Sequence, residues 1–168
     1  MSFDIHLIDA TQSKSAVEVQ ALVGEVLIRH GARIIRKDVI EHVTPEGRTL
    51  KVAVENIEGP DDLRIEWYGP SQEGGRTSAQ ATPRNGSLRD TCRVIYDMAA
   101  HVPWIIAPTM EGDVLLQPIE SRDIPIAYDD FPPVTIIENA DALETILSKG
   151  LDQWLGYRNR ILGIPQNK

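Results

Sequence analysis

Cysteine is almost absent from the chain: Cys92 is the one cysteine among 168 residues. A single thiol excludes an intramolecular disulfide framework and a zinc site built on several cysteines. Long apolar runs are absent as well, and none approaches the roughly 20 residues that span a membrane. The opening residues Met1–Asp4 lack the basic region and apolar run of a secretory signal. These absences predict a soluble cytoplasmic protein.

Positive charge and aromatic residues are also scarce. Lys and Arg number 17 against 25 Asp and Glu, for a formal net charge of −8, and aromatic residues make up 5% of the chain. Nucleic acids and anionic membranes are bound through basic patches, so both classes of partner are excluded. The low aromatic content predicts a core made mostly of Ile, Leu and Val.

Sequence motifs that bind phosphate or carry a nucleophile are missing. The chain contains neither Gly-Lys-Ser/Thr nor Gly-x-Gly-x-x-Gly, and it has no Gly-x-Ser-x-Gly. Gly74-Gly75-Arg76 fits a flexible linker better than a phosphate loop. We therefore expect no bound cofactor, and the sequence favours a protein that is not an enzyme.

Apolar residues make up 42% of the chain, which suffices for one sizeable core. Alternating apolar residues predict a strand at Phe3–Leu7 and an antiparallel meander of three strands within 33–43, 50–54 and 63–67. Residues 104–106 and 114–116 are expected to pair across a turn, and Val134–Ile137 is expected to form the last strand.

Three segments have the apolar spacing of helices, and a capping signal precedes each. Gly150 leaves open a bend in the last helix, because glycine costs about 1 kcal/mol relative to alanine. The whole pattern predicts one α+β domain over residues 1–168, in which a mostly antiparallel sheet packs against about three helices. The expected helices are Ala16–His30, Leu88–His101 and Ala142–Leu155, with caps at Ser15 and Glu18, Ser87 and Asp90, and Asp141 and Glu144.

Residues 69–86 form a polar stretch rich in Gly, Ser, Thr and Pro. The stretch contains no apolar side chain larger than alanine, so it buries too little surface to order itself. We predict a flexible loop or lid there.

Negative charge is concentrated in residues 111–141, which we call the acidic segment. It holds eight acidic residues and one base, Arg122, and thus carries seven of the eight net negative charges. Four prolines exclude one continuous helix and a central strand, and predict a stiff surface. We predict a partner-binding surface there, made of Glu120, Asp123, Tyr128, Asp129, Asp130 and Phe131, and we call it the acidic surface.

Other roles for the acidic surface stay open. Its carboxylates could bind a hard cation such as Ca²⁺ or Mg²⁺, although the twelve-residue EF-hand pattern is missing and we predict no metal. They could also be plain solvated surface. Tyr128 and Phe131 could be interface hot spots or could anchor the segment to the core.

The histidines offer the main alternative. His6 shares a strand face with Asp4, which would allow a carboxylate–histidine pair, whereas Glu41 and His42 fall on opposite faces. His30 and His101 lie near predicted helix C-termini, where the helix dipole favours positive charge. No pair of these four residues has the spacing of a helical metal site. Cys92 falls on an apolar helix stripe, which indicates a buried, inert thiol.

Two functions from different classes follow. The first is a non-catalytic cytoplasmic binding protein that masks a basic protein partner, a profile shared by bacterial immunity proteins that neutralise toxins. The second is a small enzyme that uses His6, His42 or His101 with a carboxylate. The sequence determines neither the identity of the partner nor the oligomeric state.

Trp67, Trp104 and Trp154 each fall on an apolar face and are predicted to lie in the core.

Overall fold

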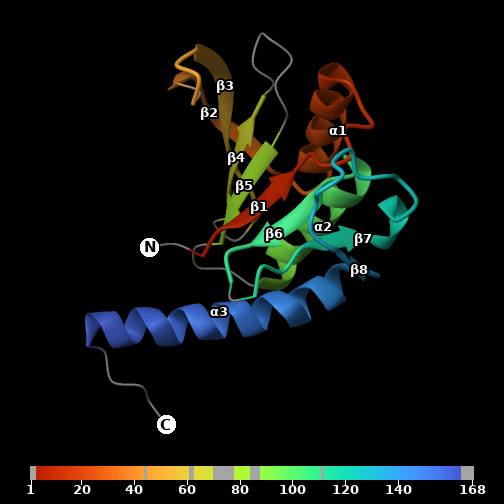
Figure 1. Cartoon of the computed structure of the whole chain (residues 1–168). Helices are drawn as coiled ribbons and strands as arrows, with labels where there is room; N and C mark the ends of the chain where they lie inside the picture. Colours follow the sequence, from red (N-terminus) through yellow and green to blue (C-terminus); the bar gives the residue numbers. More distant parts are fainter. Residues whose placement is uncertain are drawn as a thin grey trace.

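The computed structural model describes residues 3–43, 45–60, 63–69, 78–83, 88–110 and 112–163. Among these residues, eight strands form one sheet and three α-helices pack with it (Figure 1). The predicted α+β class, with a mostly antiparallel sheet and about three helices, is confirmed. The elements are β1 (Ile5–Ile8), α1 (Ala16–Arg29), β2 (Arg33–Val43), β3 (Thr49–Glu58), β4 (Arg64–Tyr68), β5 (Ser78–Thr82), α2 (Leu88–His101), β6 (Ile105–Pro108), β7 (Leu116–Pro118), the 3-10 turn η2 (Ile119–Ser121), β8 (Thr135–Ile137) and α3 (Ala140–Leu162).

The strand order is β2-β3-β4-β5-β1-β6-β7-β8. The first strand of the chain therefore lies inside the sheet, where it pairs antiparallel with β5 and with β6. The predicted meander is present as β2, β3 and β4, and the predicted pairing of the strands around 105 and 115 is present through Ile106 and Leu116. The one parallel pair among the described strands joins β7 to β8.

One face of the sheet is covered by the main core. The other, which we call the open face, is at least partly exposed at β4, β5 and β1 but is buried at Ile105 of β6 and Gln117 of β7. Ile5 and Leu7 of β1, with Ile65 and Trp67 of β4, point to the covered face and are almost fully buried. These four residues belong to the hydrophobic core. The core also includes Val19, Val23 and Val26 of α1 and Val94, Ile95 and Met98 of α2. Figure 1 shows α3 running along one end of the strands, and its residues Leu143 and Leu147 join this core. No described helix is long and apolar enough to cross a membrane.

Local chemistry explains where the helices begin. At α1, the Ser15 hydroxyl accepts from Glu18 N at 3.3 Å, and Ser15 N donates to the Glu18 carboxylate at 2.8 Å, which is the predicted capping box. At α3, the prediction of Asp141 as the cap is wrong. Asn139 caps that helix, and its side-chain oxygen accepts from Ala142 N at 2.9 Å. Ser87 lies outside the described residues.

Helix α3 continues without a break through Gly150 and ends at Leu162, later than predicted. A Cβ built on Gly150 would lie 3.1 Å from Met110 Cβ, so the glycine permits a close approach of the helix to that side chain. Gly163 follows the helix with φ of 65°, a left-handed conformation that glycine adopts without a steric penalty. Packing thus outweighs the low helix propensity of Gly150.

The predicted loop at 69–86 is wrong for Ser78–Thr82, which form the internal strand β5. Ala79 and Ala81 are buried on the covered face, and β5 pairs with β4 on one side and β1 on the other. Two neighbouring strands supply the hydrogen bonds, so small side chains suffice to hold the strand. Residues 70–77 and 84–87 lie outside the described part of the chain.

Candidate functional site

The acidic surface lies on the connection between β7 and β8. That connection is tied to the end of β1 by a hydrogen bond from Ala127 N to Ala10 O at 2.8 Å. At its start, Ser121 is buried and its hydroxyl donates to Pro118 O at 3.0 Å, while Gln117 Nε2 donates to Ser121 O at 2.9 Å. These contacts fix both the beginning and the middle of the connection relative to the sheet.

Tyr128 and Phe131 form a stacked pair within this connection. Their ring centroids are 6.3 Å apart with an interplanar angle of 26°. Both side chains are half-buried, and Gln12 Nε2 donates to the Tyr128 hydroxyl. The pair therefore fastens the connection to the residues after β1 while part of each side chain remains accessible to a partner.

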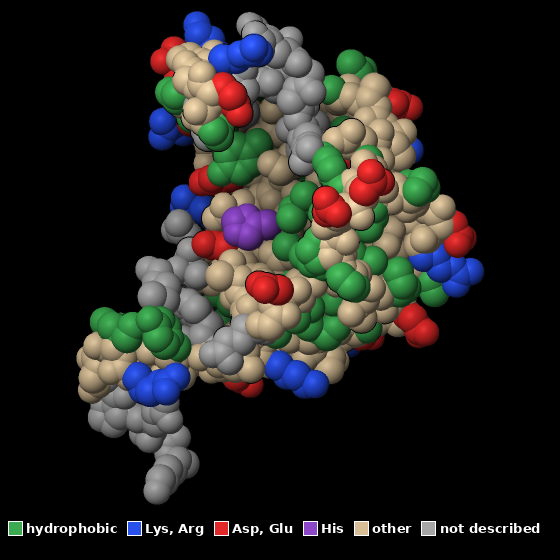
Figure 2. Space-filling model, in the orientation of Figure 1, with side chains coloured by type: hydrophobic (Ala, Val, Ile, Leu, Met, Phe, Trp, Pro, Cys, Tyr) green, Lys and Arg blue, Asp and Glu red, His purple; other side chains and the backbone are tan. Residues whose placement is uncertain are grey.

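The carboxylates of Asp123, Asp129 and Asp130 are exposed, and the Asp123 side chain is 92% accessible. Arg122 Nε lies 3.6 Å from the Asp123 carboxylate, and within the described chain neither Asp129 nor Asp130 forms an ion pair. Figure 2 shows acidic side chains interspersed with hydrophobic ones over this part of the surface. The region therefore carries negative charge that is largely uncompensated.

Several acidic residues elsewhere on the molecule are paired with bases. Their partners lie on the same or a neighbouring strand or helix, so much of their charge is neutralised locally. The pairs include Arg33–Glu58 at 2.8 Å, Lys37–Glu55 at 3.0 Å, Arg36–Asp38 at 2.7 Å and Arg29–Asp97 at 2.9 Å. Asp129 and Asp130 form no such pair within the described chain, and they are adjacent in the sequence.

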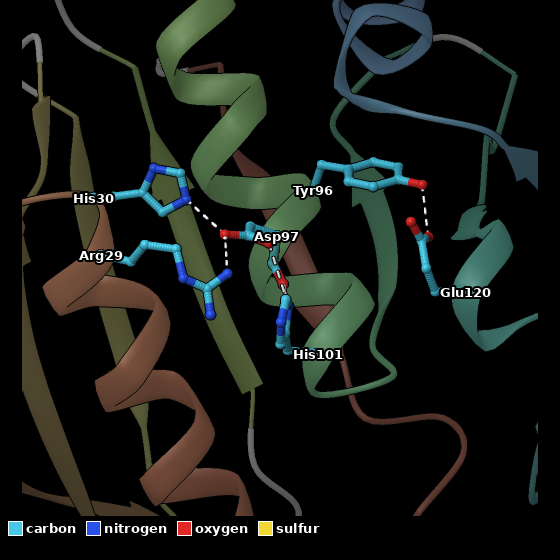
Figure 3. Close-up of polar contacts among 6 residues, drawn as sticks. All are labelled: Arg29, His30, Tyr96, Asp97, His101 and Glu120. Atoms are coloured by element: carbon cyan, nitrogen blue, oxygen red, sulfur yellow. Dashed lines mark hydrogen bonds and ion pairs between the residues drawn. The ribbon is translucent and has the colours of Figure 1, made fainter.

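Glu120 differs from the other members of the acidic surface. Its carboxylate accepts a hydrogen bond at 2.7 Å from the hydroxyl of Tyr96, which rises from α2 (Figure 3). Burial, and then this hydrogen bond, raise the pKa of Tyr96. Glu120 thus holds η2 against α2, a role that the sequence pattern did not reveal.

A second polar cluster joins the ends of α1 and α2 around Asp97. One carboxylate oxygen of Asp97 lies 2.9 Å from Arg29 Nη1 and 2.8 Å from His30 Nε2 (Figure 3). His101 Nδ1 lies 2.8 Å from the backbone oxygen of Asp97, which can only accept, so Nδ1 carries a proton. His101 Nδ1 also lies 3.2 Å from the second carboxylate oxygen of Asp97. Arg29, His30 and His101 thus meet at one carboxylate, which forms a structural junction between α1 and α2.

Replacing Asp97 by asparagine is expected to lower the free energy of unfolding by about 1 kcal/mol, because partly exposed ion pairs contribute modestly. Urea denaturation should show the loss at low salt, and the loss should shrink as salt screens the lost charge. Asp90→Asn is the matched control, since Asp90 forms an exposed pair with Arg93 on the same helix. If Asp97→Asn were as stable as the parent, the cluster would not hold the helices together.

The other candidate histidines lie apart from this cluster. His6 is exposed on the open face of β1, while the Asp4 carboxylate accepts a hydrogen bond from Thr82 Oγ1 at 2.7 Å. His42 lies in β2 opposite Leu50, and its side chain is outside the described part of the structure. A small pocket near the start of β4 includes Arg64 and Glu66 but no histidine in its lining.

Cys92 and the tryptophans follow the sequence prediction where they are described. Cys92 is fully buried, and burial raises the pKa of its thiol to about 12, with a further contribution from Glu144. Trp67 and Trp104 are buried and lie with ring centroids 5.7 Å apart. The side chain of Trp154 is not among those described. Over the described residues, no three His, Cys, Asp or Glu side chains could together hold a metal ion.

Comparison with known proteins does not assign the chain to a family. No protein-family model, no curated protein and no solved structure matches the chain.

Proposed function

We propose that this chain is a binding protein whose acidic surface docks onto a basic protein partner and masks it, as bacterial immunity proteins do with toxic enzymes. The observation that carries the proposal is the uncompensated charge of Asp129 and Asp130, which lie in sequence between the stacked rings of Tyr128 and Phe131. A negative surface of this kind attracts a cationic partner and raises the rate of encounter.

The attachment of the acidic surface to the sheet supports the same proposal. Ala127 and Tyr128 form hydrogen bonds with Ala10 and Gln12, respectively. These hydrogen bonds hold the acidic surface in place in the absence of a partner. A preformed surface loses less conformational entropy on binding than a mobile one. Tyr128 and Phe131 would supply the apolar contact, because half-exposed aromatic side chains often dominate binding energy.

The direct test is to immobilise the chain, capture proteins from the cytoplasm of its native cells, and identify what is retained at low salt and released at high salt. A basic protein retained by the parent and lost with Asp129→Asn/Asp130→Asn would support the proposal. Retention of no basic protein would overturn it and would favour the enzyme hypothesis.

With a captured partner, Asp129→Asn/Asp130→Asn should slow association by roughly tenfold at low salt, because electrostatic steering is reduced. The salt dependence of the association rate should flatten as well, and stopped-flow mixing measures both. The matched control is Glu25→Gln/Asp152→Asn, which removes the same two charges from exposed positions on α1 and α3. Equal slowing by both variants would mean that only net charge matters, and an unchanged rate would place the interface elsewhere.

A further inference from the structure

The two ends of the sheet differ greatly. The β8 end has a strand of three residues, whereas β2 at the other end has eleven. β2 pairs with β3 on one side, and no described strand pairs with its other side. A free edge of that length presents a row of unpaired N–H and C=O groups that can accept another strand.

Apolar side chains line this free edge. Val39 is 67% exposed and Val43 is 63% exposed, and Ile34, Ile35 and Ile40 are each more than 40% exposed. Edge strands are normally protected by brevity, proline, bulges or outward charges. β2 has an irregularity between Ile34 and Arg36, but from Lys37 onward its pairing with β3 is regular.

The charged residues of β2 give the edge weak protection, because several bind within their own chain. Lys37 Nζ lies 3.0 Å from Glu55 of β3, and Arg36 Nε lies 2.7 Å from Asp38 of the same strand. Val39 and Val43 therefore stand exposed beside charges that are already partly neutralised. This combination favours burial of the edge by a partner strand.

The order of charges along β2 indicates which partner fits. Basic residues come first, at Arg33, Arg36 and Lys37, and acidic residues follow, at Asp38 and Glu41. An antiparallel strand of the same sequence would place basic against acidic residues. If Val39 faced its own copy, Lys37 would lie opposite Glu41 of the second copy on the same face of the sheet.

We propose that two copies of this chain associate through β2, antiparallel and with Val39 on the two-fold axis. The two sheets then continue into one, and the exposed valines and isoleucines of both edges pack against each other. The interface lies on β2, whereas the proposed partner-binding surface lies between β7 and β8 near the opposite end of the sheet. Failure of one proposal therefore leaves the other unaffected.

Charge substitution at Val39 tests the symmetry. Val39→Lys alone, or Val39→Asp alone, would set two like charges against each other across the axis, and each variant should sediment as a monomer of 18.7 kDa. An equimolar mixture of the two variants should restore a dimer that contains one copy of each. The parent should be a dimer by the same measurement, and circular dichroism checks that the variants fold.

Val17→Lys is the control, because Val17 is 78% exposed on α1 and the substitution adds the same charge away from the edge. It should remain dimeric. A parent that is monomeric at about 100 µM would overturn the proposal, since dimers this weak have no role at ordinary concentrations. Dimers that persist in both Val39→Lys and Val39→Asp would also overturn it, because the interface would then lie elsewhere.

Disulfide formation tests the register. Val39→Cys should cross-link with itself under mild oxidation, whereas Val43→Cys should not. Glu41→Cys should cross-link only when it is mixed with Lys37→Cys, which faces it in the proposed register. The native Cys92 is buried and does not compete in the folded protein. Self-linking of Val43→Cys in preference to Val39→Cys would overturn the proposed register.

Discussion

Replacing Trp104 by alanine is expected to lower the free energy of unfolding by about 3–5 kcal/mol. Trp104 is fully buried immediately before β6 and packs against Trp67, with which it forms a tilted aromatic pair. Truncation would remove that contact and leave a large cavity between the sheet and its helices. Urea denaturation, followed by circular dichroism, measures the change as a lower midpoint.

Trp104→Phe provides the matched control. The indole Nε1 of Trp104 is buried and has no hydrogen-bond partner among the described residues. A buried donor without a partner is costly, so phenylalanine would remove that cost while keeping an aromatic ring against Trp67. We expect a loss of about 1 kcal/mol for this variant, because phenylalanine is smaller and leaves a small cavity, while removal of the unpaired donor offsets part of that cost. A similar loss for the Ala and Phe variants would contradict this account.

Replacing Ala81 by leucine is expected to destabilise the protein by about 3 kcal/mol, because added atoms in a packed core displace their neighbours. Ala81 is fully buried on the covered face of β5, and its register places it directly between Ile65 of β4 and Ile5 of β1. Ile5 and Ile65 are themselves almost fully buried, so a larger side chain at position 81 is expected to displace them. Thermal and urea unfolding both report the loss.

Gln80→Leu is the control for Ala81→Leu. Gln80 precedes Ala81 on the same strand but points to the open face, between Glu66 and His6. The same side chain there should change the free energy of unfolding by no more than about 0.5 kcal/mol. If Ala81→Leu were tolerated equally well, β5 would not have the orientation described.

The elements that depend on local chemistry could be predicted from the sequence. Ser15 and Glu18 indicated the start of α1, and the alternation around Ile5 and Leu7 indicated β1. β5 was missed because its core residues are alanines, and their burial depends on strands supplied from elsewhere in the chain. The prediction of a loop assumed that an ordered segment needs large apolar side chains. That assumption fails for an internal strand such as β5, because its two neighbouring strands hold it in place by hydrogen bonds.

The candidate sites were harder to predict than the fold. Concentrated charge indicated the acidic surface, and the exposure of Asp129 and Asp130 agrees with that interpretation, while the binding role stays a prediction. Two interactions were not foreseen: Asp97 with His30, and Tyr96 with Glu120. Both join residues that are far apart in sequence, so only the packing of the helices brings them together.

The central position of β1 has a consequence for how the chain folds. β1 precedes both of its partners, β5 and β6, in the chain and is separated from them by many residues. Contacts between distant segments form slowly, because closing a long loop costs conformational entropy before the new strand pairing stabilises the structure. The hairpins among β2, β3 and β4 can form locally meanwhile. Ile5 and Leu7 therefore remain without their native neighbours on the growing chain, and the two halves of the sheet stay separate until the first strand is inserted between them.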